Sequence, residues 1–226
     1  MVLRLPFLHN QAMGPTAVHL SLLALAWAAY GALHSLLAVE GVKAWVAARF
    51  PAVVPAYRLA YNLVALLALL PVVGLMSLHP GPWLWRWTGP LGWLLDGLAL
   101  GAVGLLGVGP ATYDLREFLG LRALQEGRGE LIDHEAFRIS DLHRHVRHPW
   151  YALCLLALWT RDMSAARLVS ALAITAYLVI GSRLEEQKLI ARFGEAYRRY
   201  QERVPGLLPR PWRVLSREEA RRLQGG

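Results

Sequence analysis

Residues 165–184 read AARLVSALAITAYLVIGSRL, an apolar run in which only Arg167 and Arg183 are charged. As an α-helix, a run of roughly 20 residues crosses the ~30 Å hydrocarbon core of a bilayer. A second apolar run, Pro149–Thr160, comes just before it, and only a tight turn fits between the two. This stretch therefore predicts an antiparallel helical hairpin in a membrane. The Pro149–Thr160 run is only about 12 residues long, near 18 Å as a helix, so it either starts earlier, near Leu142, or is shallow and partly cytosolic.

Three more apolar runs precede the hairpin: Thr16–Val39, Leu59–Leu78 and Leu91–Val108. Each is long enough to cross a bilayer. Hydrophobic residues make up 55% of the 226 residues and charged residues 18%, whereas an average soluble domain has about 25% charged residues. This composition argues against a disordered chain, a fibre and an ordinary water-soluble enzyme. The sequence predicts an all-α polytopic membrane protein with about five transmembrane helices and a C-terminal helical hairpin.

Lysine and arginine are unevenly distributed among the segments that join these runs. Of the 24 such residues, 20 fall in three alternate segments. These are the segment between Thr16–Val39 and Leu59–Leu78, the segment between Leu91–Val108 and Pro149–Thr160, and the segment from Arg183 onward. Cytoplasmic segments of membrane proteins carry this excess. We expect the N-terminus outside and the C-terminus in the cytoplasm. The net charge of +8 then reflects contact with anionic membrane lipids rather than with nucleic acid.

The chain is expected to divide into two parts. Residues 1–109 would form an N-terminal region of three spans. Residues 110–226 would combine a cytoplasmic loop, the helical hairpin and a basic C-terminal tail. The large polar segments share the cytoplasmic face, where chemistry with a cytosolic reagent is expected. The single cysteine, Cys154, excludes an intramolecular disulfide and a cysteine-based metal cage, and we expect no metal site.

The densest polar cluster is DLHRHVRHPWY, residues 141–151, at the start of the shorter hairpin run. It contains His143, Arg147 and His148, followed by Pro149, which can begin a helix. In one interpretation these cations bind an anionic or carboxylate-bearing ligand, with aromatic walls that include Tyr151. In the other they are a positively charged membrane anchor with interfacial aromatic residues. The residues alone leave both open.

A second cluster, Arg183-Leu-Glu185-Glu186, lies at the other end of the hairpin. Two adjacent carboxylates at a membrane boundary are costly to desolvate, although a solvated helix with Glu/Lys pairs would also contain them. In an antiparallel hairpin, the start of one helix lies beside the end of the other. His148 and Glu185 are therefore expected to be neighbours.

Two other features carry weaker predictions. Tyr197 and Tyr200 follow helical spacing in a basic amphipathic segment, which favours packing over catalysis. His34 and Asp96 fall within predicted spans, and ionisable residues there are functional candidates. An inward-facing polar residue with its hydrogen bonds satisfied is nearly as good an explanation.

Three motifs together resemble the integral-membrane methyltransferase superfamily, which includes isoprenylcysteine carboxyl methyltransferases and phospholipid methyltransferases. They are Arg147-His148-Pro149-x-Tyr151, Glu185-Glu186-x-x-Leu189 and Phe193-Gly194-x-x-Tyr197-x-x-Tyr200-x-x-x-Val204-Pro205. The resemblance covers about a third of the chain, Phe137 to Pro209. Within the superfamily the chain looks most like the branch of bacterial methanethiol S-methyltransferases and NnrU-like proteins. It departs from that branch at His143, where a tyrosine is usual, and in the hairpin turn.

The resemblance implies a methyltransferase core in residues 110–226, with S-adenosylmethionine as methyl donor in a pocket open to the cytoplasm. It also implies a protein of the bacterial inner (plasma) membrane. It implies catalytic roles for Arg147, Arg183 and Glu185, with Arg183 addressing the acceptor. If only one of the two adjacent carboxylates points inward, the family pattern favours Glu185. The implied cofactor-binding residues are Glu135, Phe137, Arg138, His143, His148, Pro149, Tyr151 and Glu185.

The methyl acceptor and two other functions stay open at this point. The acceptor is expected to be a small thiol or a lipid-like molecule such as a prenylcysteine. One alternative is an NnrU-type membrane protein that keeps the scaffold without catalysis. Another is an NADPH-dependent membrane reductase, because sterol reductases have a related C-terminal scaffold.

Overall fold

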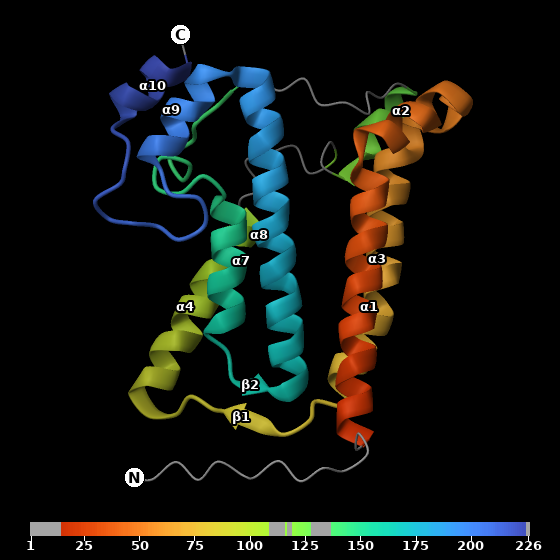
Figure 1. Ribbon diagram of the computed structural model, residues 1–226, viewed down its shortest axis with the longest axis vertical. Coiled ribbons are helices and arrows are strands. Elements are labelled where there is room, and N and C mark those ends of the chain that lie inside the picture. Colours follow the sequence, from red (N-terminus) through yellow and green to blue (C-terminus); the bar gives the residue numbers. More distant parts are fainter. Residues whose placement is uncertain (1–14, 109–115, 117–118, 128–136, 225–226) are drawn as a thin grey trace.

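The computed structural model describes residues 15–108, 116, 119–127 and 137–224, and these residues are overwhelmingly helical (Figure 1). The described part contains four helices long and apolar enough to cross a membrane. They are α1 (Pro15–Ala38), α3 (Val54–Leu78), α4 (Gly89–Val108) and α8 (Ala165–Phe193). The prediction of an all-α polytopic protein is confirmed.

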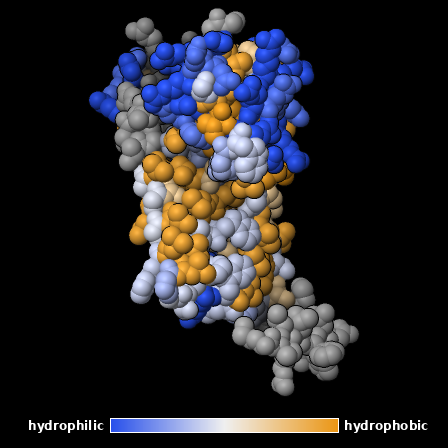
Figure 2. Space-filling model, turned by 90° about the vertical axis from the view of Figure 1, so that its left-hand side faces the viewer, coloured by the Kyte–Doolittle hydropathy of each residue, from blue (hydrophilic) through white to orange (hydrophobic). Residues whose placement is uncertain are grey.

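The long helices present apolar side chains outward rather than hiding them. Trp93 and Leu100 of α4 are 75% and 72% exposed, and Leu25 of α1 is 65% exposed. Exposing these apolar side chains to water would be unfavourable, whereas lipid tails solvate them. Figure 2 shows the same division over one face, where a broad hydrophobic band ends in a hydrophilic region. The chain is an integral membrane protein.

The shorter helix of the hairpin, α7, spans only Pro149–Trp159, 11 residues. Of the two alternatives open from the sequence, the structure has the short helix rather than one that starts near Leu142. The residues from Asp141 to Arg147 form turns and bends instead. Within the described residues, four long helices are thus accompanied by one helix of about half their length.

The hairpin itself has the predicted antiparallel form, with α7 running alongside α8 (Figure 1). At its turn, the Oγ of Ser164 caps α8 by accepting a bond from the amide of Arg167 at 3.3 Å. The turn also contains β2 (Met163–Ser164), which pairs antiparallel with β1 (Trp83–Trp85) from the loop between α3 and α4. This small sheet ties that loop to the hairpin.

Asp96 of α4 also contacts the hairpin turn, through an ion pair with Arg161. Asp162 accepts a bond from the backbone amide of Trp87 at 2.8 Å. Asp96 thus has a structural partner at the end of the molecule opposite the two polar clusters. We assign it no role in chemistry.

On its other side, α8 packs against α1, which in turn packs against α3. Leu23, Val72 and Ala166, from these three helices, form a buried cluster. The N-terminal helices therefore contact the hairpin directly. The proposed division into residues 1–109 and 110–226 stays a prediction, and its boundary lies outside the described residues.

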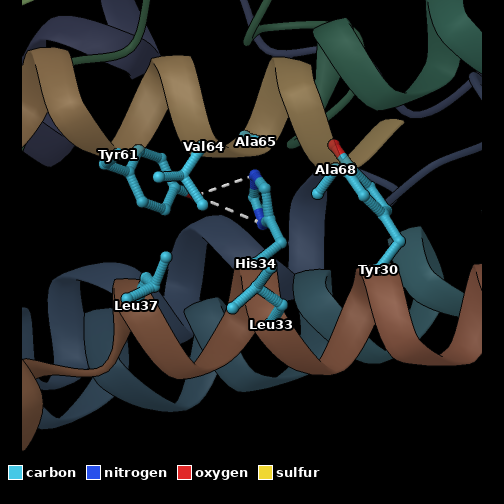
Figure 3. A pocket seen from close by; sticks show the side chains of 8 residues that line it. All are labelled: Tyr30, Leu33, His34, Leu37, Tyr61, Val64, Ala65 and Ala68. Atoms are coloured by element: carbon cyan, nitrogen blue, oxygen red, sulfur yellow. Dashed lines mark hydrogen bonds between the residues drawn. The ribbon is translucent and has the colours of Figure 1, made fainter. Parts of the chain in front are cut away.

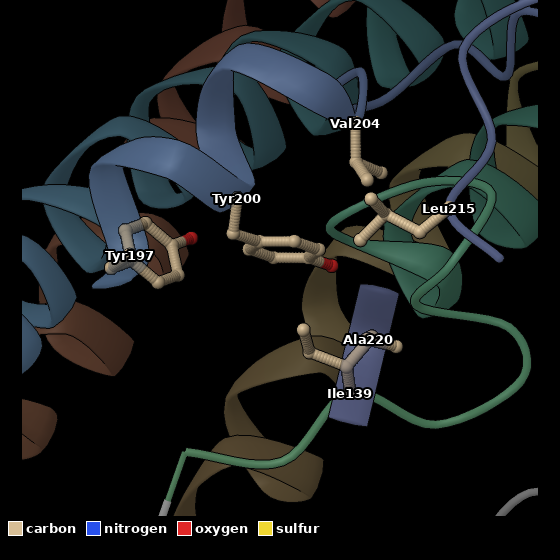
Figure 4. Close-up of a cluster of buried hydrophobic side chains, with 6 residues drawn as sticks. All are labelled: Ile139, Tyr197, Tyr200, Val204, Leu215 and Ala220. Carbon is tan, nitrogen blue, oxygen red and sulfur yellow. The ribbon is translucent and has the colours of Figure 1, made fainter. Parts of the chain in front are cut away.

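Shorter helices complete the described structure. They are α2 (Glu40–Arg49), a 3-10 helix (Pro51–Val53), α6 (Leu121–Glu126), α9 (Glu195–Arg203) and α10 (Arg217–Gln224). With the segment from residue 137 to 148, α9 and α10 form a polar cap over the hairpin ends (Figure 1). Tyr197 and Tyr200, each 2% exposed, lie in the core of this cap with Ile139, Val204 and Leu215 (Figure 4). Their predicted packing role is confirmed.

Candidate active site at the polar end of the hairpin

The start of α7 is held by the segment that follows α9. The amide of Arg147 donates to the carbonyl of Pro205 at 2.8 Å, and the amide of His148 donates to the carbonyl of Gly206 at 3.0 Å. His148 has φ −120° and ψ 71°, which is not helical. Because residues 147 and 148 pair with another segment, the helix begins only at Pro149, where the missing N–H costs nothing.

Arg147 and Glu186 form a largely buried ion pair at the base of the site. The Nε of Arg147 donates to Oε1 of Glu186 at 2.7 Å, and each side chain is 12% exposed. Nη1 of Arg147 donates to the carbonyls of Gln201, at 3.0 Å, and of Val204. The side-chain Nε2 of Gln201 donates to Oε2 of Glu186 at 2.7 Å. These bonds join the entrance of α7 to α8 and α9.

His148 connects this pair to a more accessible group. Its Nε2 is 3.0 Å from Oε1 of Glu186, and its Nδ1 is 3.5 Å from Oε2 of Glu185. The ring of His148 is buried and stacks on that of Tyr151, with 5.3 Å between centroids and 8° between planes. The hydroxyl of Tyr151 donates to Oε2 of Glu185 at 3.3 Å. The predicted meeting of His148 and Glu185 is confirmed.

The family pattern favoured Glu185 as the carboxylate that points inward, and the structure differs. Both contact His148, and Glu186 is the one drawn into the protein, while the side chain of Glu185 is 50% exposed. The guanidinium of Arg147 that binds Glu186 also donates to two carbonyls at the C-terminal end of α9, those of Gln201 and Val204. Glu186 is therefore committed to internal bonds, and Glu185 keeps a surface that a ligand can reach.

Two other predicted residues N-terminal to α7, Phe137 and His143, lie in the cap. Phe137 packs in its aromatic core, with ring centroids 5.4 Å from Phe193 and 5.6 Å from Tyr200. Nδ1 of His143 is 2.7 Å from the Oγ of Ser140. Burial lowers the pKa of His143, and the nearby His148 lowers it further. At neutral pH, His143 is therefore a neutral hydrogen-bonding group rather than a cation.

Two predicted residues are not drawn into this cluster. Arg138 and Arg183 have exposed side chains, and Glu135 lies outside the described residues. Pro149 is buried at the start of α7. The roles assigned to all of these residues from the resemblance stay predictions.

Gln201 and Gly206 belong to the site although the sequence reasoning did not single them out. A Cβ at Gly206 would lie 3.3 Å from Nη2 of Arg147, so glycine lets the chain pass close to the guanidinium. The signal available was the position of both residues beside the Val204-Pro205 end of the family motif. Nothing in the motif indicated that backbone carbonyls there would bind Arg147.

Comparison with known proteins identifies the family. The chain is 38% identical over 181 residues to "Methanethiol S-methyltransferase 2" of Bradyrhizobium diazoefficiens, covering 78% of this chain and 68% of that protein. It is 33% identical over 187 residues to "Methanethiol S-methyltransferase" of Pseudomonas deceptionensis, covering 78% and 67%. The chain belongs to the methanethiol S-methyltransferase family. The resemblance seen in the motifs, and the expectation of a membrane methyltransferase, are confirmed.

Members of the methanethiol S-methyltransferase family are not the only similar proteins. "Nurim" of Xenopus laevis is 32% identical over 117 residues, covering 50% of this chain and 37% of nurim. No protein-family model matches the chain. No solved structure matches it either.

Proposed function

We propose that this membrane methyltransferase transfers a methyl group from S-adenosylmethionine to a small thiol at the polar end of the α7–α8 hairpin. The observation that carries the proposal is the half-exposed Glu185 beside the stacked rings of His148 and Tyr151. This group lies on the motifs that carry the resemblance described from the sequence, and relatives of the chain are named for methanethiol methylation.

The chemistry of these side chains fits the donor. S-adenosylmethionine carries an ammonium group and ribose hydroxyls, which a carboxylate such as Glu185 binds through charge-assisted hydrogen bonds. It also carries an aromatic base, for which the ring of Tyr151 offers a surface. When bound, this donor supplies a methyl group on a positively charged sulfur. The protein's task is then to orient two reactants and to exclude water.

Arg147 and Glu186 hold the site in place from inside the protein rather than bind the donor. Their charges are matched to one another within the cap. The pair holds His148 and the start of α7 against α8, which sets the position of Tyr151 relative to Glu185. A rigid supporting layer of this kind keeps binding groups in register.

The proposal includes a location and an orientation. The polar cap carries the basic residues after Arg183, and the excess of Lys and Arg supports a cytoplasmic cap and C-terminus in the bacterial inner membrane. S-adenosylmethionine then reaches the site from the cytoplasm. A small apolar thiol, or in the alternative a lipid-like acceptor, enters from the membrane.

The test is a labelled methyl-transfer assay with protein purified in detergent, over small alkanethiols, prenylcysteines and phospholipids. We expect transfer from S-adenosylmethionine to the small thiols and stabilisation of the protein by S-adenosylhomocysteine in a thermal-shift titration. Stabilisation by NADPH alone would favour the reductase. Absence of binding and transfer would favour the non-catalytic NnrU-type protein.

A further inference from the structure

The polar group predicted inside the first span, His34, is already paired with its neighbours. Its Nε2 is 2.7 Å from the hydroxyl of Tyr61 on α3 (Figure 3), and its Nδ1 is 2.8 Å from the hydroxyl of Tyr177 on α8. Of the two explanations open for His34, these contacts favour an inward-facing residue whose hydrogen bonds are satisfied. A feature that still lacks a partner lies elsewhere, on the surface of the polar cap.

The segment between α9 and α10 forms a loop whose two ends are tied to the start of the hairpin. The carbonyl of Gly206 accepts a bond from the amide of His148 at 3.0 Å. At the other end, the amide of Leu215 donates to the carbonyl of Arg144 at 3.1 Å, and Nε of Arg144 donates to the carbonyl of Leu215 at 2.8 Å. Residues 207–214, between these two ends, form the cap loop.

The first of these ties places the cap loop at the edge of the hydrocarbon core. The apolar run of α8 from Ala165 to Leu184 is roughly 20 residues long, or about 30 Å as a helix, which is the thickness of that core. Glu186 comes just after this run, and it contacts His148, whose amide is bonded to Gly206. The cap loop therefore begins at the level where the lipid headgroups begin. Figure 1 shows it bowing outward on the side of the cap that faces the hydrophobic helices.

The cap loop exposes large apolar side chains. Leu208 is 73% exposed and Trp212 is 79% exposed. Within the described residues 194–224, these are the large apolar side chains left on the surface, because Tyr197 and Tyr200 of α9 are packed inside the cap. Tryptophan is favoured where a membrane meets water, because its ring is apolar and its N–H is polar.

The backbone of the cap loop suits a lipid surface as well. Pro209 and Pro211 lie between Leu208 and Trp212, so two of these five consecutive residues have no backbone N–H. An N–H group that leaves water without a partner is costly in lipid. Proline removes that cost at two positions of the exposed stretch.

The charges of the cap loop are positive and unmatched. Residues 207–214 contain two arginines and no acidic residue. The side chain of Arg210 is exposed and makes no hydrogen bond or ion pair within the described residues. Arg213 donates to the backbone carbonyl of Glu202 rather than to a carboxylate. An anionic phosphate in the headgroup layer would supply the partner that Arg210 lacks, with the stem of the side chain against apolar groups.

We propose that the cap loop inserts Leu208 and Trp212 into the headgroup region of the leaflet that adjoins the cap, where Arg210 binds the phosphate of an anionic phospholipid. The inference goes beyond the proposed function and does not depend on it. A bilayer fits better than a second copy of the chain, because two copies that met through this loop would bring like charges together. Since both ends of the loop are bonded to residues 144–148, its insertion also fixes the start of α7 relative to the membrane surface.

The test measures where Leu208 lies in protein reconstituted into lipid nanodiscs. In a Cys154→Ala background, which removes the single cysteine, Leu208→Cys carries the fluorophore NBD. The reference label is at Glu218→Cys on α10, where the side chain is 76% exposed. One quencher is a nitroxide attached to a lipid, and the other is acrylamide in the water. We expect the nitroxide lipid to quench the label at position 208 and acrylamide to quench the label at position 218.

Nanodiscs of phosphatidylcholine, with and without phosphatidylglycerol, test the anionic headgroup. One arginine near an anionic surface changes an equilibrium about fivefold. We therefore expect Arg210→Gln to lower the ratio of inserted to water-exposed loop about fivefold when phosphatidylglycerol is present, and to leave it unchanged in phosphatidylcholine alone. Trp212→Ser should lower the ratio in both. Arg221→Gln is the matched control, because it removes an exposed charge from α10, and it should behave as the parent does.

Three results would overturn the inference. If acrylamide reached position 208 of the parent as freely as position 218, the cap loop would lie in water. If neither quencher reached position 208, protein such as a second copy of the chain would cover it. If Arg210→Gln and Arg221→Gln had equal effects, the charge of the whole cap rather than Arg210 would be responsible. None of these readings requires that the protein transfer a methyl group.

Discussion

Arg147 and Glu186, 39 residues apart in the sequence, form a 2.7 Å ion pair at which α7, α8 and the segment after α9 meet. Each side chain is only 12% exposed, so the pair is largely screened from water. Breaking a buried pair by removing one charge leaves the other desolvated, at a cost of about 3–5 kcal/mol. The pair therefore sets the stability of the cap over the hairpin.

We expect Glu186→Gln to lower the thermal midpoint of unfolding of the detergent-purified protein by many degrees. Unfolding of membrane proteins is often irreversible, so midpoints are compared at one heating rate. Glu195→Gln is the control, because Glu195 pairs with Arg199 on the surface, with both side chains 68% exposed. Its midpoint should stay close to that of the parent. Equal midpoints for the two variants would contradict the supporting role of Glu186.

Glu185 should behave in the opposite way. Because its side chain is half exposed, we expect Glu185→Gln to leave the thermal midpoint nearly unchanged. The loss of one charge-assisted hydrogen bond of about 1.5–3 kcal/mol should weaken S-adenosylhomocysteine binding about tenfold to a hundredfold. Isothermal titration measures the affinity, with Glu195→Gln again as control. Parent-like binding by the Glu185 variant would remove this residue from the donor site.

The arrangement of the hairpin was predictable from local sequence. A short turn between two apolar runs requires antiparallel helices, and Pro149 marks a helix start. These two facts brought His148 and Glu185 together without knowledge of the rest of the chain. The tyrosines of α9 were likewise placed by their helical spacing.

Other features depend on contacts between distant segments. Glu185 and Glu186 differ by 100° around α8, and the choice of Glu186 follows from where the carbonyls of Gln201 and Val204 hold Arg147. No hydrophobic periodicity in the sequence shows where Arg147 contacts these carbonyls. The pairing of Trp83–Trp85 with Met163–Ser164 is similar, because strands of two or three residues are too short to show an alternating pattern.

The tyrosines of the cap predict how its stability depends on alkaline pH. Burial is the main cause that raises the pKa of both Tyr197 and Tyr200 above the ordinary 10.0. A raised pKa in the folded state means that this stability is fully present below pH 10 and is lost as the pH rises further, because the unfolded chain releases the protons first.

We expect the thermal midpoint to fall more steeply above pH 10 in the parent than in the double variant Tyr197→Phe/Tyr200→Phe. At neutral pH the double variant should itself be less stable, because Tyr200 donates to the carbonyl of His143 at 2.6 Å. A thermal-shift series from pH 7 to above pH 10 measures both effects. An identical alkaline slope in the two proteins would show that other groups control it.

Gly120 predicts a steric requirement where α6 approaches α3. Its φ is +83°, and a Cβ there would lie 2.8 Å from the amide nitrogen of Leu59 and 2.9 Å from Cβ of Arg58. Gly127 also has a positive φ, +62°, but a Cβ there would meet nothing within 4 Å. Gly127→Ala should therefore cost only the left-handed strain of about 1–2 kcal/mol. Gly120→Ala adds a backbone clash, and we expect a clearly lower thermal midpoint. Equal midpoints would mean that α3 and α6 separate without cost.

The orientation in the membrane predicts which segments a reporter can reach. A C-terminal fusion after Gln224 should be active with a cytoplasmic reporter and silent with a periplasmic one, because the basic residues of the cap resist translocation. A fusion within residues 80–88, between α3 and α4, should give the reverse result. This loop pairs with the hairpin turn through β1 and β2, so the turn must lie on the same side.

The control for this prediction is a double variant, Arg161→Glu with Asp96→Arg, which exchanges the charges of one ion pair. It leaves the number of positive charges at that end unchanged, so its reporter pattern should match that of the parent. A cytoplasmic signal from the loop fusion would reverse the orientation and place the candidate active site on the opposite side from cytosolic S-adenosylmethionine.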